Sequence, residues 1–245
     1  RVSGLKVIER AGCTLVDAGL PSDRLNAVCG APRQLLTSDD IRWVLDYYRE
    51  RQLPFAWWVG PSDLWAGDAL CPHGLALRVI EMGMAGRLDR LELPAVGPGV
   101  DVRRATCLGD VMDHAGLLAS AVSPVDEELR GFYERAAEAV LHPTTDRQLF
   151  VLYEHNVPQS TAELCVSQHV VGLYSVTTQR VARARGYAAK VAAVALRFAR
   201  DAMRAETVVL QSSPRDRPTY ERFGLHAIGE FHRFVPESDD AEWAG

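Results

Sequence analysis

The sequence lacks the features that define several classes of protein. No apolar run approaches the roughly 18 residues that span a bilayer, and the first residues lack the pattern of a secretory signal. The chain starts at Arg1 rather than at a methionine, which indicates a trimmed or processed chain. Cysteine is scarce, with five residues, an odd number, and no C-x-x-C pair. We therefore expect reduced thiols and a cytoplasmic location rather than a disulfide framework.

Metal ligands at useful spacing and an excess of positive charge are also missing. Cys71 and His73 in the stretch CPHG supply half of a metal site, but no second Cys/His pair at ligand spacing completes it. The formal net charge is -5, which gives no support to general nucleic-acid binding. The apolar share of 47% is that of an ordinary globular protein. We predict no metal, no nucleic-acid partner and no membrane partner.

What the second half of the sequence contains is an alternation of helices and strands. Ser123, with a proline next to it and Asp126 three positions on, is typical of a capped helix start. The residues that follow it at helical spacing are apolar: Leu129, Phe132, Tyr133, Ala136 and Val140. Beyond this helix the pattern predicts a hairpin of strands 147–155 and 160–169, a strand at 170–176, a helix from Gly186, a strand at 207–213, a short helix at 217–224 and a closing strand at 225–235.

Two of these strands are expected to be parallel. A strand followed by a long helix and then by another strand normally forms a right-handed crossover. Strands 170–176 and 207–211 should therefore lie side by side within an otherwise antiparallel sheet. The sequence thus predicts an α/β (α+β) domain whose mixed, mostly antiparallel sheet is flanked by helices.

The first half of the sequence repeats this order faintly, about 150 residues earlier. The pattern predicts a capped helix at 37–52, a strand at 53–60, a short helix at 61–70 and a hairpin of strands 74–82 and 86–93. The stretch LPAVGPGVDV holds two prolines and two glycines in ten residues, and it marks the domain junction. We predict an N-terminal domain at 1–97, a C-terminal domain at 98–236 and a flexible tail at 237–245.

The segment Val176–Asp201 carries six cations and no acid before Asp201, although the chain as a whole is acidic. Its centre, RARGYA, lies between the end of a predicted strand and the start of a predicted helix. The amides at a helix N-terminus and the positive end of the helix dipole attract phosphate, and Gly186 lets the backbone approach an oxygen closely. The segment matches neither G-x-x-x-x-G-K-[ST] nor the three-glycine dinucleotide fingerprint. It indicates a pyrophosphate ligand.

The same hexapeptide fits [QR]-x-x-G-x-[GA] and resembles the acetyl-coenzyme A (acetyl-CoA) loop of the GNAT N-acetyltransferase superfamily. VVGLYSVTT before it, a long amphipathic helix after it, VVLQSS, and PTYERFGL, which resembles the closing signature of that family, extend the resemblance over roughly residues 101–236. FAWWVGP resembles the degenerate N-terminal domain of tandem members. The resemblance implies two tandem GNAT-like domains, of which the C-terminal one binds acetyl-CoA as a cosubstrate.

The resemblance also implies roles for individual residues. Strand backbone would hold the pantetheine arm, amides of the loop would bind the pyrophosphate, and a backbone N–H at a strand bulge near Tyr174–Val176 would polarise the acetyl carbonyl. Tyr220 would protonate the departing thiolate. Apart from the resemblance, the hairpin residue Glu154 is the predicted catalytic base, which would deprotonate the amine directly or through water. The predicted cofactor-binding residues are Tyr174, Ser175, Val176, Thr177, Thr178, Arg183, Ala184, Arg185, Gly186, Tyr187, Ala188, Ser212 and Tyr220.

This chain departs from the family pattern at two places. Ala184 and Ala188 stand where many members of the family have glycine, although Ala188 still satisfies the pattern. The asparagine that often precedes the closing tyrosine is missing from SSPRDRPTY, near Ser212 and Ser213. The second departure leaves the positioning of the coenzyme at this point open.

Several alternatives stay open at the level of sequence. Glu163 and His155 are further candidates for the base, and Cys165 is either an acyl-carrying nucleophile or a buried small hydrophobe. Tyr220 is either an acid or a core aromatic residue, and the arginines are either ligands or a solvated helix face. Trp57 and Trp58 point to opposite faces of a strand, so one of them should lie in the core.

The resulting prediction is an N-acetyltransferase that transfers an acetyl group to a primary amine of a small molecule or peptide by direct attack. The first alternative is a non-catalytic module that senses acyl-CoA, and the second is a nucleic-acid-binding protein, which the net charge disfavours. The acceptor amine, the acyl selectivity and the choice between monomer and homodimer are not encoded in any pattern that we recognise.

Overall fold

The structure is a computed structural model that describes residues 4–237. These residues form two compact units: unit 1 comprises residues 4–82 and 228–237, and unit 2 comprises residues 83–227. The predicted flexible tail lies outside the described residues except for Glu237, whose amide donates to the carbonyl of Gly74 at 2.9 Å. The units divide the chain differently from the predicted ranges 1–97 and 98–236, because most of the last strand belongs to unit 1.

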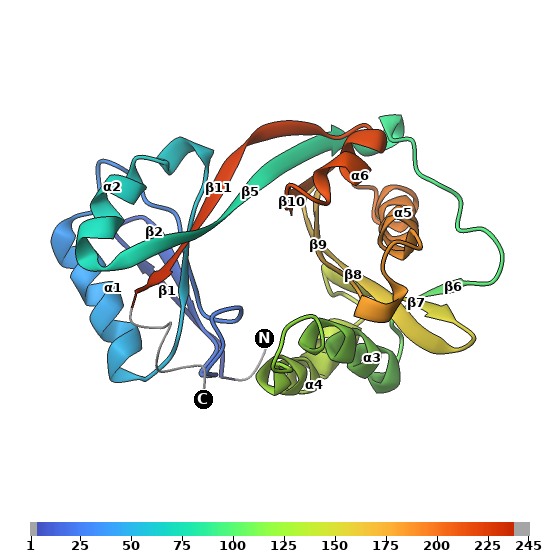
Figure 1. Ribbon diagram of the computed structural model, residues 1–245, viewed down its shortest axis with the longest axis horizontal. Helices are drawn as coiled ribbons and strands as arrows, with labels where there is room; N and C mark the ends of the chain where they lie inside the picture. Colours follow the sequence, from blue (N-terminus) through green and yellow to red (C-terminus); the bar gives the residue numbers. More distant parts are fainter. Residues whose placement is uncertain (1–3, 238–245) are drawn as a thin grey trace. The chain divides into compact units, whose positions relative to one another are not determined.

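Unit 1 is a sheet packed against two helices, α1 and α2 (Figure 1). Its strands follow the order β1-β2-β3-β4-β11, in which only β3 and β4 are parallel. The predicted cap of α1 is confirmed, because Thr37 and Asp40 each accept a hydrogen bond from the backbone amide of the other. The elements are β1 (Lys6–Arg10), β2 (Cys13–Asp17), β3 (Ala27–Cys29), α1 (Ser38–Glu50), β4 (Ala56–Val59), η1 (Pro61–Asp63), α2 (Ala66–Leu70) and η2 (Cys71–His73).

The core of unit 1 forms where the apolar residues of its sheet meet those of α1 and α2. Trp57 is fully buried there, and its indole N–H donates to the carbonyl of Gly30 at 3.0 Å. Trp58, on the other face of β4, is half-buried. The prediction that one of the two tryptophans lies in the core is therefore confirmed for Trp57.

Unit 2 contains the longer strands and three of the four long helices of the described chain. Its strands follow the order β5-β10-β9-β8-β7-β6, and the predicted hairpin β7–β8 and the predicted parallel pair β9–β10 are both present. The elements are η3 (Leu88–Arg90), β6 (Asp101–Arg104), α3 (Leu108–Ala119), α4 (Glu127–Leu141), β7 (Arg147–Glu154), β8 (Val157–Ser167), β9 (Val170–Thr178), η4 (Arg180–Ala182), α5 (Tyr187–Asp201), β10 (Thr207–Ser212) and α6 (Arg217–Arg222). Strands β5 (Leu75–Arg87) and β11 (His226–Pro236) belong to both units, since residues 75–82 and 228–236 count to unit 1 and the rest to unit 2.

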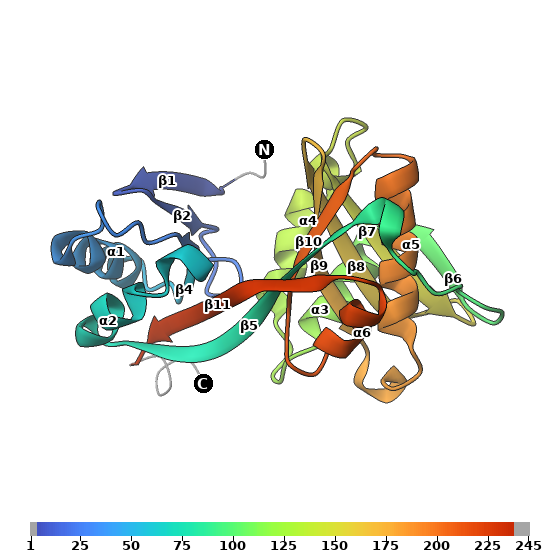
Figure 2. The same cartoon turned by 90° about the horizontal axis from the view of Figure 1, so that it is seen from above.

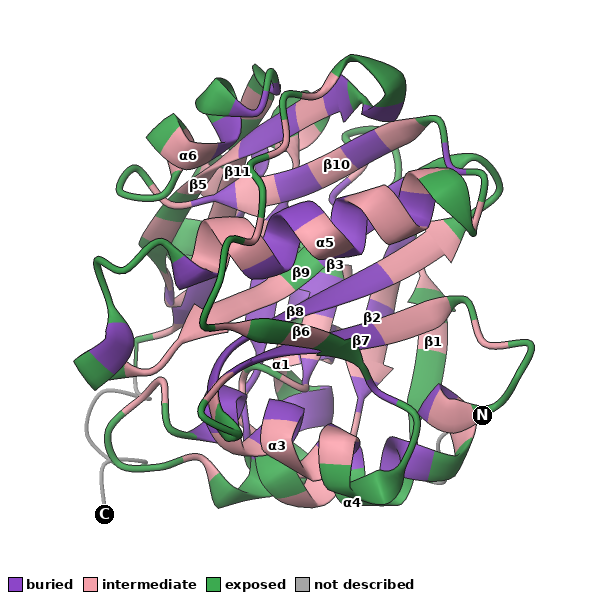
Figure 3. Ribbon diagram, turned by 90° about the vertical axis from the view of Figure 1, so that its right-hand side faces the viewer, coloured by how far each residue is buried: buried purple, intermediate pink, exposed green. Residues whose placement is uncertain are grey.

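Helices cover both faces of the sheet in unit 2. Helix α5 lies against one face of β7, β8 and β9, and α3 with α4 lies against the other (Figure 1). Several residues of α5 are buried (Figure 3), and most of these are alanine or valine, which are small. Because β8 and β9 are covered on both faces, polar side chains that point from them toward α3 and α4 are buried.

The two units contain the same succession of elements. The order β2, β3, α1, β4, α2, β5 in the first half corresponds to β8, β9, α5, β10, α6, β11 in the second, with matching elements about 150 residues apart. The last strand of each half is exchanged: β11 pairs with β4, and β5 lies next to β10. This succession supports the predicted duplication, and the exchange was not predicted.

Two local predictions were wrong. Residues 74–93 form no hairpin, because β5 runs without a break from Leu75 to Arg87. Gly86, the first residue of the predicted second strand, lies inside β5 in close packing, since a Cβ there would lie 3.2 Å from side-chain atoms of both Leu225 and Leu91. Helix α4 begins at Glu127 rather than after Ser123, because Asp126 is the residue that caps it and accepts from the amide of Leu129.

Two further properties of the described chain bear on the function. None of the helices in residues 4–237 is long and apolar enough to cross a membrane. The five cysteines, all of which are described, form no disulfide bond.

Candidate active site

The parallel strands β9 and β10 separate in the second half of their length. Their pairing covers three positions, from Thr207 opposite Val170 to Val209 opposite Gly172, and β9 then continues to Thr178 and β10 to Ser212. The predicted strand residues, Tyr174 to Thr178, all follow the last paired position. Figure 2 labels the two neighbouring strands. The ring of Tyr174 lies over Gly172, where a Cβ would be 2.2 Å from it. From Ser175 to Thr178, the side of β9 that faces β10 has no strand partner in the pairing of the described residues.

A β-bulge interrupts β9 directly after the strands separate. The pairing of β8 with β9 shifts between Thr161 and Glu163, so that Ser175 and Val176 together oppose one residue of β8. Ser175 has a left-handed backbone (φ 55°), which is uncommon for a residue other than glycine. Such a bulge turns backbone groups away from the ladder. The bulge lies where the sequence placed it, within Tyr174–Val176.

The loop from Arg183 to Ala188 leads into the N-terminus of α5. Ala184 (φ 65°) and Gly186 (φ 74°) are both left-handed, and Gly186 caps the helix without any side-chain hydrogen bond. The first amides of a helix have no intrahelical acceptor. The space at the Cβ position of Gly186 is empty within 4 Å, so its backbone conformation is what requires glycine there. The first amides of α5 are therefore the ones suited to an anion, whereas the amide of Arg183 donates to the carbonyl of Arg180 at 3.5 Å.

The cations of this segment do not form one patch. Arg197 donates to the carbonyls of Leu93 and Pro94 and so ties α5 to the linker, while Arg200 pairs on the surface with its neighbour Asp201. Among the described residues, Arg180 and Arg183 are exposed and form no ion pair. The cations of this segment therefore have different uses. Arg197 stabilises the fold, whereas Arg180 and Arg183 have no ion pair among the described residues and are available to a ligand.

Glu154, the predicted base, is bound on both oxygens. Arg185 donates to Oε1 and Oε2, each at 2.7 Å, and the hydroxyl of Tyr187 donates to Oε1. The hydrogen bonds from Tyr187 and Arg185 lower the pKa of Glu154. A carboxylate stabilised in its ionised form is a weak base. Glu154 therefore holds the Arg183–Ala188 loop, and the charge of Arg185 is balanced by Glu154 rather than left for a ligand.

We expect the substitution Glu154→Gln to leave the chemical step nearly intact. A lost general base lowers turnover by 10²-fold to 10⁴-fold, whereas loss of a loop contact changes mainly the affinity for the coenzyme. The kcat at saturating acetyl-CoA should stay within about threefold of the parent, with the larger change in KM for acetyl-CoA. A hundredfold fall in kcat would restore Glu154 as the base.

Tyr220, the predicted acid, lies in α6 with 7% of its surface exposed. Among the described residues no group accepts a hydrogen bond from its hydroxyl, and the hydroxyl oxygen is not one of the fully buried unpaired atoms. Burial, with a smaller contribution from Asp216, raises the pKa of Tyr220 well above its ordinary value. The ring is therefore held by packing, while the hydroxyl keeps its proton and is unoccupied.

Ser212 and Cys165 have partners or surroundings that argue against direct roles. Ser212 is buried and its hydroxyl donates to the carbonyl of Ser213 at 3.0 Å, so its side chain is not available to a coenzyme. Burial raises the pKa of the Cys165 thiol, which disfavours the thiolate that a nucleophile needs.

A buried cluster of polar side chains lies on the α3–α4 side of the sheet. Its centre is Glu163, which is 4% exposed and accepts from the hydroxyl of Tyr133 at 2.6 Å and that of Ser175 at 3.1 Å. Arg147 pairs with its other oxygen at 2.6 Å. His114, fully buried, approaches Glu163 at 3.8 Å. With three donors on its two oxygens, Glu163 has little capacity to act as a base.

Sequence analysis missed most of this cluster. Glu163 was considered only as a base, and Tyr133 only as an apolar residue of a helix stripe. The members come from α3, α4, β7, β8 and β9, and α3 itself was not predicted. No spacing in a single segment marks side chains that meet only after folding.

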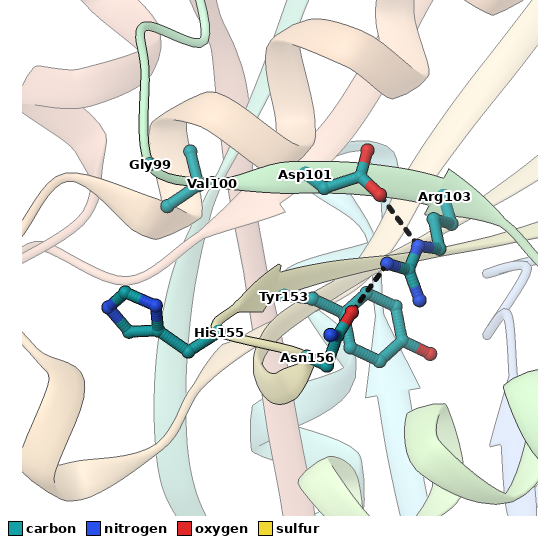
Figure 4. A pocket seen from close by; sticks show the side chains of 7 residues that line it. All are labelled: Gly99, Val100, Asp101, Arg103, Tyr153, His155 and Asn156. Carbon is teal, nitrogen blue, oxygen red and sulfur yellow. Dashed lines mark hydrogen bonds and ion pairs between the residues drawn. The ribbon is translucent and has the colours of Figure 1, made fainter.

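His155 lies at a different place, at the rim of a pocket of about 300 Å³ (Figure 4). The pocket is lined by β6, the end of β7 and the two-residue turn His155–Asn156, both of whose residues are left-handed. Arg103 in the pocket already donates to Asp101 and to Asn156. None of the lining residues belongs to β9, to the Arg183–Ala188 loop or to α6.

Cys71 and His73 lie together in η2. Within the part of the chain that the structure describes, no group of three or more His, Cys, Asp or Glu side chains lies close enough to hold a metal ion.

In the GNAT fold, a bulged strand separates from its parallel neighbour and leads to the N-terminus of a helix. Comparison with solved structures shows that this chain has the GNAT fold. A GCN5-related N-acetyltransferase from Kribbella flavida superposes with a TM-score of 0.72 at 15% identity, over 96% of this chain and 90% of that one. A GCN5-related N-acetyltransferase from Sphaerobacter thermophilus gives 0.55 at 16% identity, over 91% and 79%.

A tandem GNAT protein from the clavulanic acid biosynthesis pathway is similar over 96% of this chain and 84% of its own length, with a TM-score of 0.60 at 10% identity. No family model matches the sequence, and no curated protein sequence matches it. The likeness is therefore one of fold, and it covers both units.

Proposed function

We propose that this protein is an N-acetyltransferase that uses acetyl-CoA and transfers the acetyl group to a primary amine of a small molecule or peptide. One observation carries the proposal. The bulged, open half of β9 leads through a loop with two left-handed residues to an uncapped helix N-terminus. A ligand with an extended polar arm and a pyrophosphate matches both parts, because the open strand edge suits the amides of the arm and the helix N-terminus suits the phosphates.

The residues present fit acetyl-CoA. The amides from Arg183 to Ala188 would bind the pyrophosphate, and Arg183, which has no ion pair among the described residues, would add charge. The open edge of β9 from Tyr174 to Thr178 would hold the pantetheine arm. Ser212 contributes packing only, since its hydroxyl is occupied.

Unit 1 lacks the corresponding features. Its equivalent helix, α1, is capped by Thr37 and has Asp39 and Asp40 in its first turn, so its amides are satisfied and its charge repels phosphate. Its parallel strands stay together, since the amide of Gly30 still donates to the carbonyl of Trp58 at 3.2 Å beyond the end of β3. We therefore propose one coenzyme site per chain, in unit 2.

The proposed acetyl transfer needs a group that stabilises the acyl oxygen, a proton donor for the sulfur and a proton acceptor for the amine. When bound, acetyl-CoA supplies the acyl group as a thioester. A backbone N–H of the β9 bulge would stabilise the negative charge that develops on the acyl oxygen. Tyr220 would give its proton to the sulfur that leaves. A primary amine with a pKa of about 10.4 must lose a proton before it attacks, and because Glu154 and Glu163 are both occupied, water is the proposed acceptor.

Binding of CoA measured by isothermal titration tests the proposal, and Gly186→Val is the informative variant. A valine at φ 74° is strained and shifts the amides that bind the pyrophosphate. We expect one site per chain for the parent and at least a tenfold weaker affinity for the variant, about 1.4 kcal/mol.

The matched control is Gly97→Val, a left-handed glycine in the linker with no neighbour within 4 Å of its Cβ position. It should bind CoA as the parent does. Two sites per chain, or a Gly186→Val variant that folds normally and binds with parental affinity, would contradict the proposed site.

A further inference from the structure

The bulge of β9 is held by a contact that local strand geometry does not explain. Ser175 has a left-handed backbone in the middle of a strand, and only glycine adopts this conformation freely. A serine that stays there must be held by its surroundings. Its hydroxyl donates to Oε2 of Glu163, the residue of β8 that marks the shift in register.

Glu163 in turn is fixed from the opposite direction. Tyr133 of α4 donates to the same oxygen, Oε2, and Arg147 of β7 pairs with Oε1. Both Glu163 and Tyr133 are 4% exposed, so neither carboxylate nor phenol exchanges these partners for water. The carboxylate is thereby a rigid acceptor at one position, and the hydroxyl of Ser175 must meet it there.

We propose that Glu163 is a positioning residue, which holds Ser175 in the left-handed conformation and so aims the backbone N–H of the β9 bulge at the acyl oxygen. This inference rests on the proposed function, because the bulge has a catalytic use only if an acyl group binds against it. Glu163 touches neither reactant, and its effect passes entirely through Ser175.

Substitutions at the two positions separate this role from others. Ser175→Ala removes the anchoring hydroxyl but keeps the Cβ that disfavours a positive φ, and Glu163→Gln offers an amide that cannot satisfy all three donors. Ser175→Gly removes the hydroxyl too, yet glycine adopts the left-handed conformation without an anchor. Ser175→Gly is therefore the matched control for Ser175→Ala.

For acetyl transfer to a responsive amine we expect kcat to fall about tenfold in Ser175→Ala and in Glu163→Gln, with the KM for acetyl-CoA within about twofold of the parent. The kcat should be higher in Ser175→Gly than in Ser175→Ala, and higher in the double variant Glu163→Gln/Ser175→Gly than in Glu163→Gln alone. A double variant as impaired as Glu163→Gln would overturn the proposal and make Glu163 a direct participant. Parental kcat per folded molecule in Glu163→Gln would leave it a merely structural residue.

A second measurement needs no turnover. The three-bond coupling between the amide proton and Hα of residue 175, measured by NMR, reports φ at the bulge. In Glu163→Gln it should change from the left-handed to the extended value, while in Tyr153→Phe, a buried tyrosine outside the cluster, it should not. A left-handed value that persists in Glu163→Gln refutes the anchoring whether or not the protein is active. If the coupling changes in Glu163→Gln but the parent protein acetylates no amine, the anchoring of Ser175 stands and the proposed function alone is refuted.

Discussion

Acetyl transfer should fall roughly 10²-fold or more in Tyr220→Phe, the usual scale for the loss of a general acid, while the folded protein stays as stable as the parent. The phenylalanine keeps the ring and its edge-to-face contact with Phe223. In the described chain the hydroxyl of Tyr220 has no hydrogen-bond acceptor, so its removal breaks no bond. The predicted loss lies in kcat, because the proton is delivered only as the thiolate departs.

The structure gives this prediction a sharper form than the sequence did. A tyrosine that serves the core normally satisfies its hydroxyl with a backbone or side-chain partner. Tyr153 does so, since its hydroxyl donates to Asp113 at 2.7 Å, whereas Tyr220 does not. Burial raises the pKa of Tyr220, so the hydroxyl is protonated at neutral pH, as an acid must be before it acts.

Tyr153→Phe is the matched control. It removes a bonded hydroxyl from a buried tyrosine and should cost about 1 kcal/mol of stability, with turnover per folded molecule unchanged. Both variants are measured by thermal unfolding and by steady-state kinetics. If Tyr220→Phe unfolds at a lower temperature and retains its turnover, Tyr220 is structural, and a parent that acetylates no amine in a broad panel would favour the sensor alternative.

The second large effect concerns stability against pH, and it comes from His114. This side chain is fully buried, its Nδ1 contacts the hydroxyl of Thr161, and its Nε2 has no hydrogen-bond partner. Thr161 donates its own proton to the carbonyl of Phe150, so its hydroxyl oxygen accepts from Nδ1–H of His114. Burial lowers the pKa of His114 from 6.5 to about 4; Glu163 opposes this shift and Arg147 adds to it.

The sign of the effect follows from proton binding. Between pH 6.5 and about 4 the unfolded chain binds a proton at His114 and the folded chain does not, so the free energy of unfolding falls as the pH falls. The contribution of neutral His114 to the free energy of unfolding is complete above pH 6.5 and is lost progressively down to about pH 4. The shift of some 2.5 pKa units corresponds to roughly 3 kcal/mol. The charged groups that face the imidazole are Glu163 of β8 and Arg147 of β7, with the phenol of Tyr133 on α4.

His114→Gln should abolish this part of the pH dependence, because a neutral amide binds no proton in either state. The measurement is the free energy of unfolding in urea at several pH values, compared between parent and variant, so that the other titrating groups cancel. His142→Gln, at an exposed histidine, is the control. A parent and a His114→Gln variant that lose stability in parallel from pH 7 to pH 4 would show that His114 is protonated inside the fold.

The order of elements in unit 2 was predictable because residues that are close together in the sequence determine each helix, strand and turn. Each strand from 147 to 235 is bounded by turn residues, and the helix between the parallel strands has one apolar face, so the crossover follows from chain connectivity alone. The loop at Gly186 was predictable for the same reason, since a helix start and a left-handed glycine are properties of neighbouring residues. The bulge was placed only through the family resemblance.

What the sequence hid was the pairing of side chains from distant elements. Glu154 resembles any exposed hairpin carboxylate until Arg185 and Tyr187 are seen to occupy it, 31 and 33 positions along the chain. The surroundings of Glu163 come from five elements. The unbroken β5 was missed because residues 74–82 and 86–93 look like two separate apolar strands, whereas Gly86 lies within β5 and packs against Leu225 and Leu91.

The exchange of β5 and β11 has a consequence for any attempt to divide this protein. A cut in the linker at residues 93–102, which looks like a natural boundary in the sequence, would leave the first fragment without the partner of β4 and the second without the neighbour of β10. Neither fragment would hold a complete sheet, and each would expose an unpaired strand edge of the kind that promotes aggregation. Coexpressed, the same two fragments supply each other's missing strand. The linker is therefore a suitable position for a split reporter, in which the proposed acetyl transfer would return only when the two fragments associate.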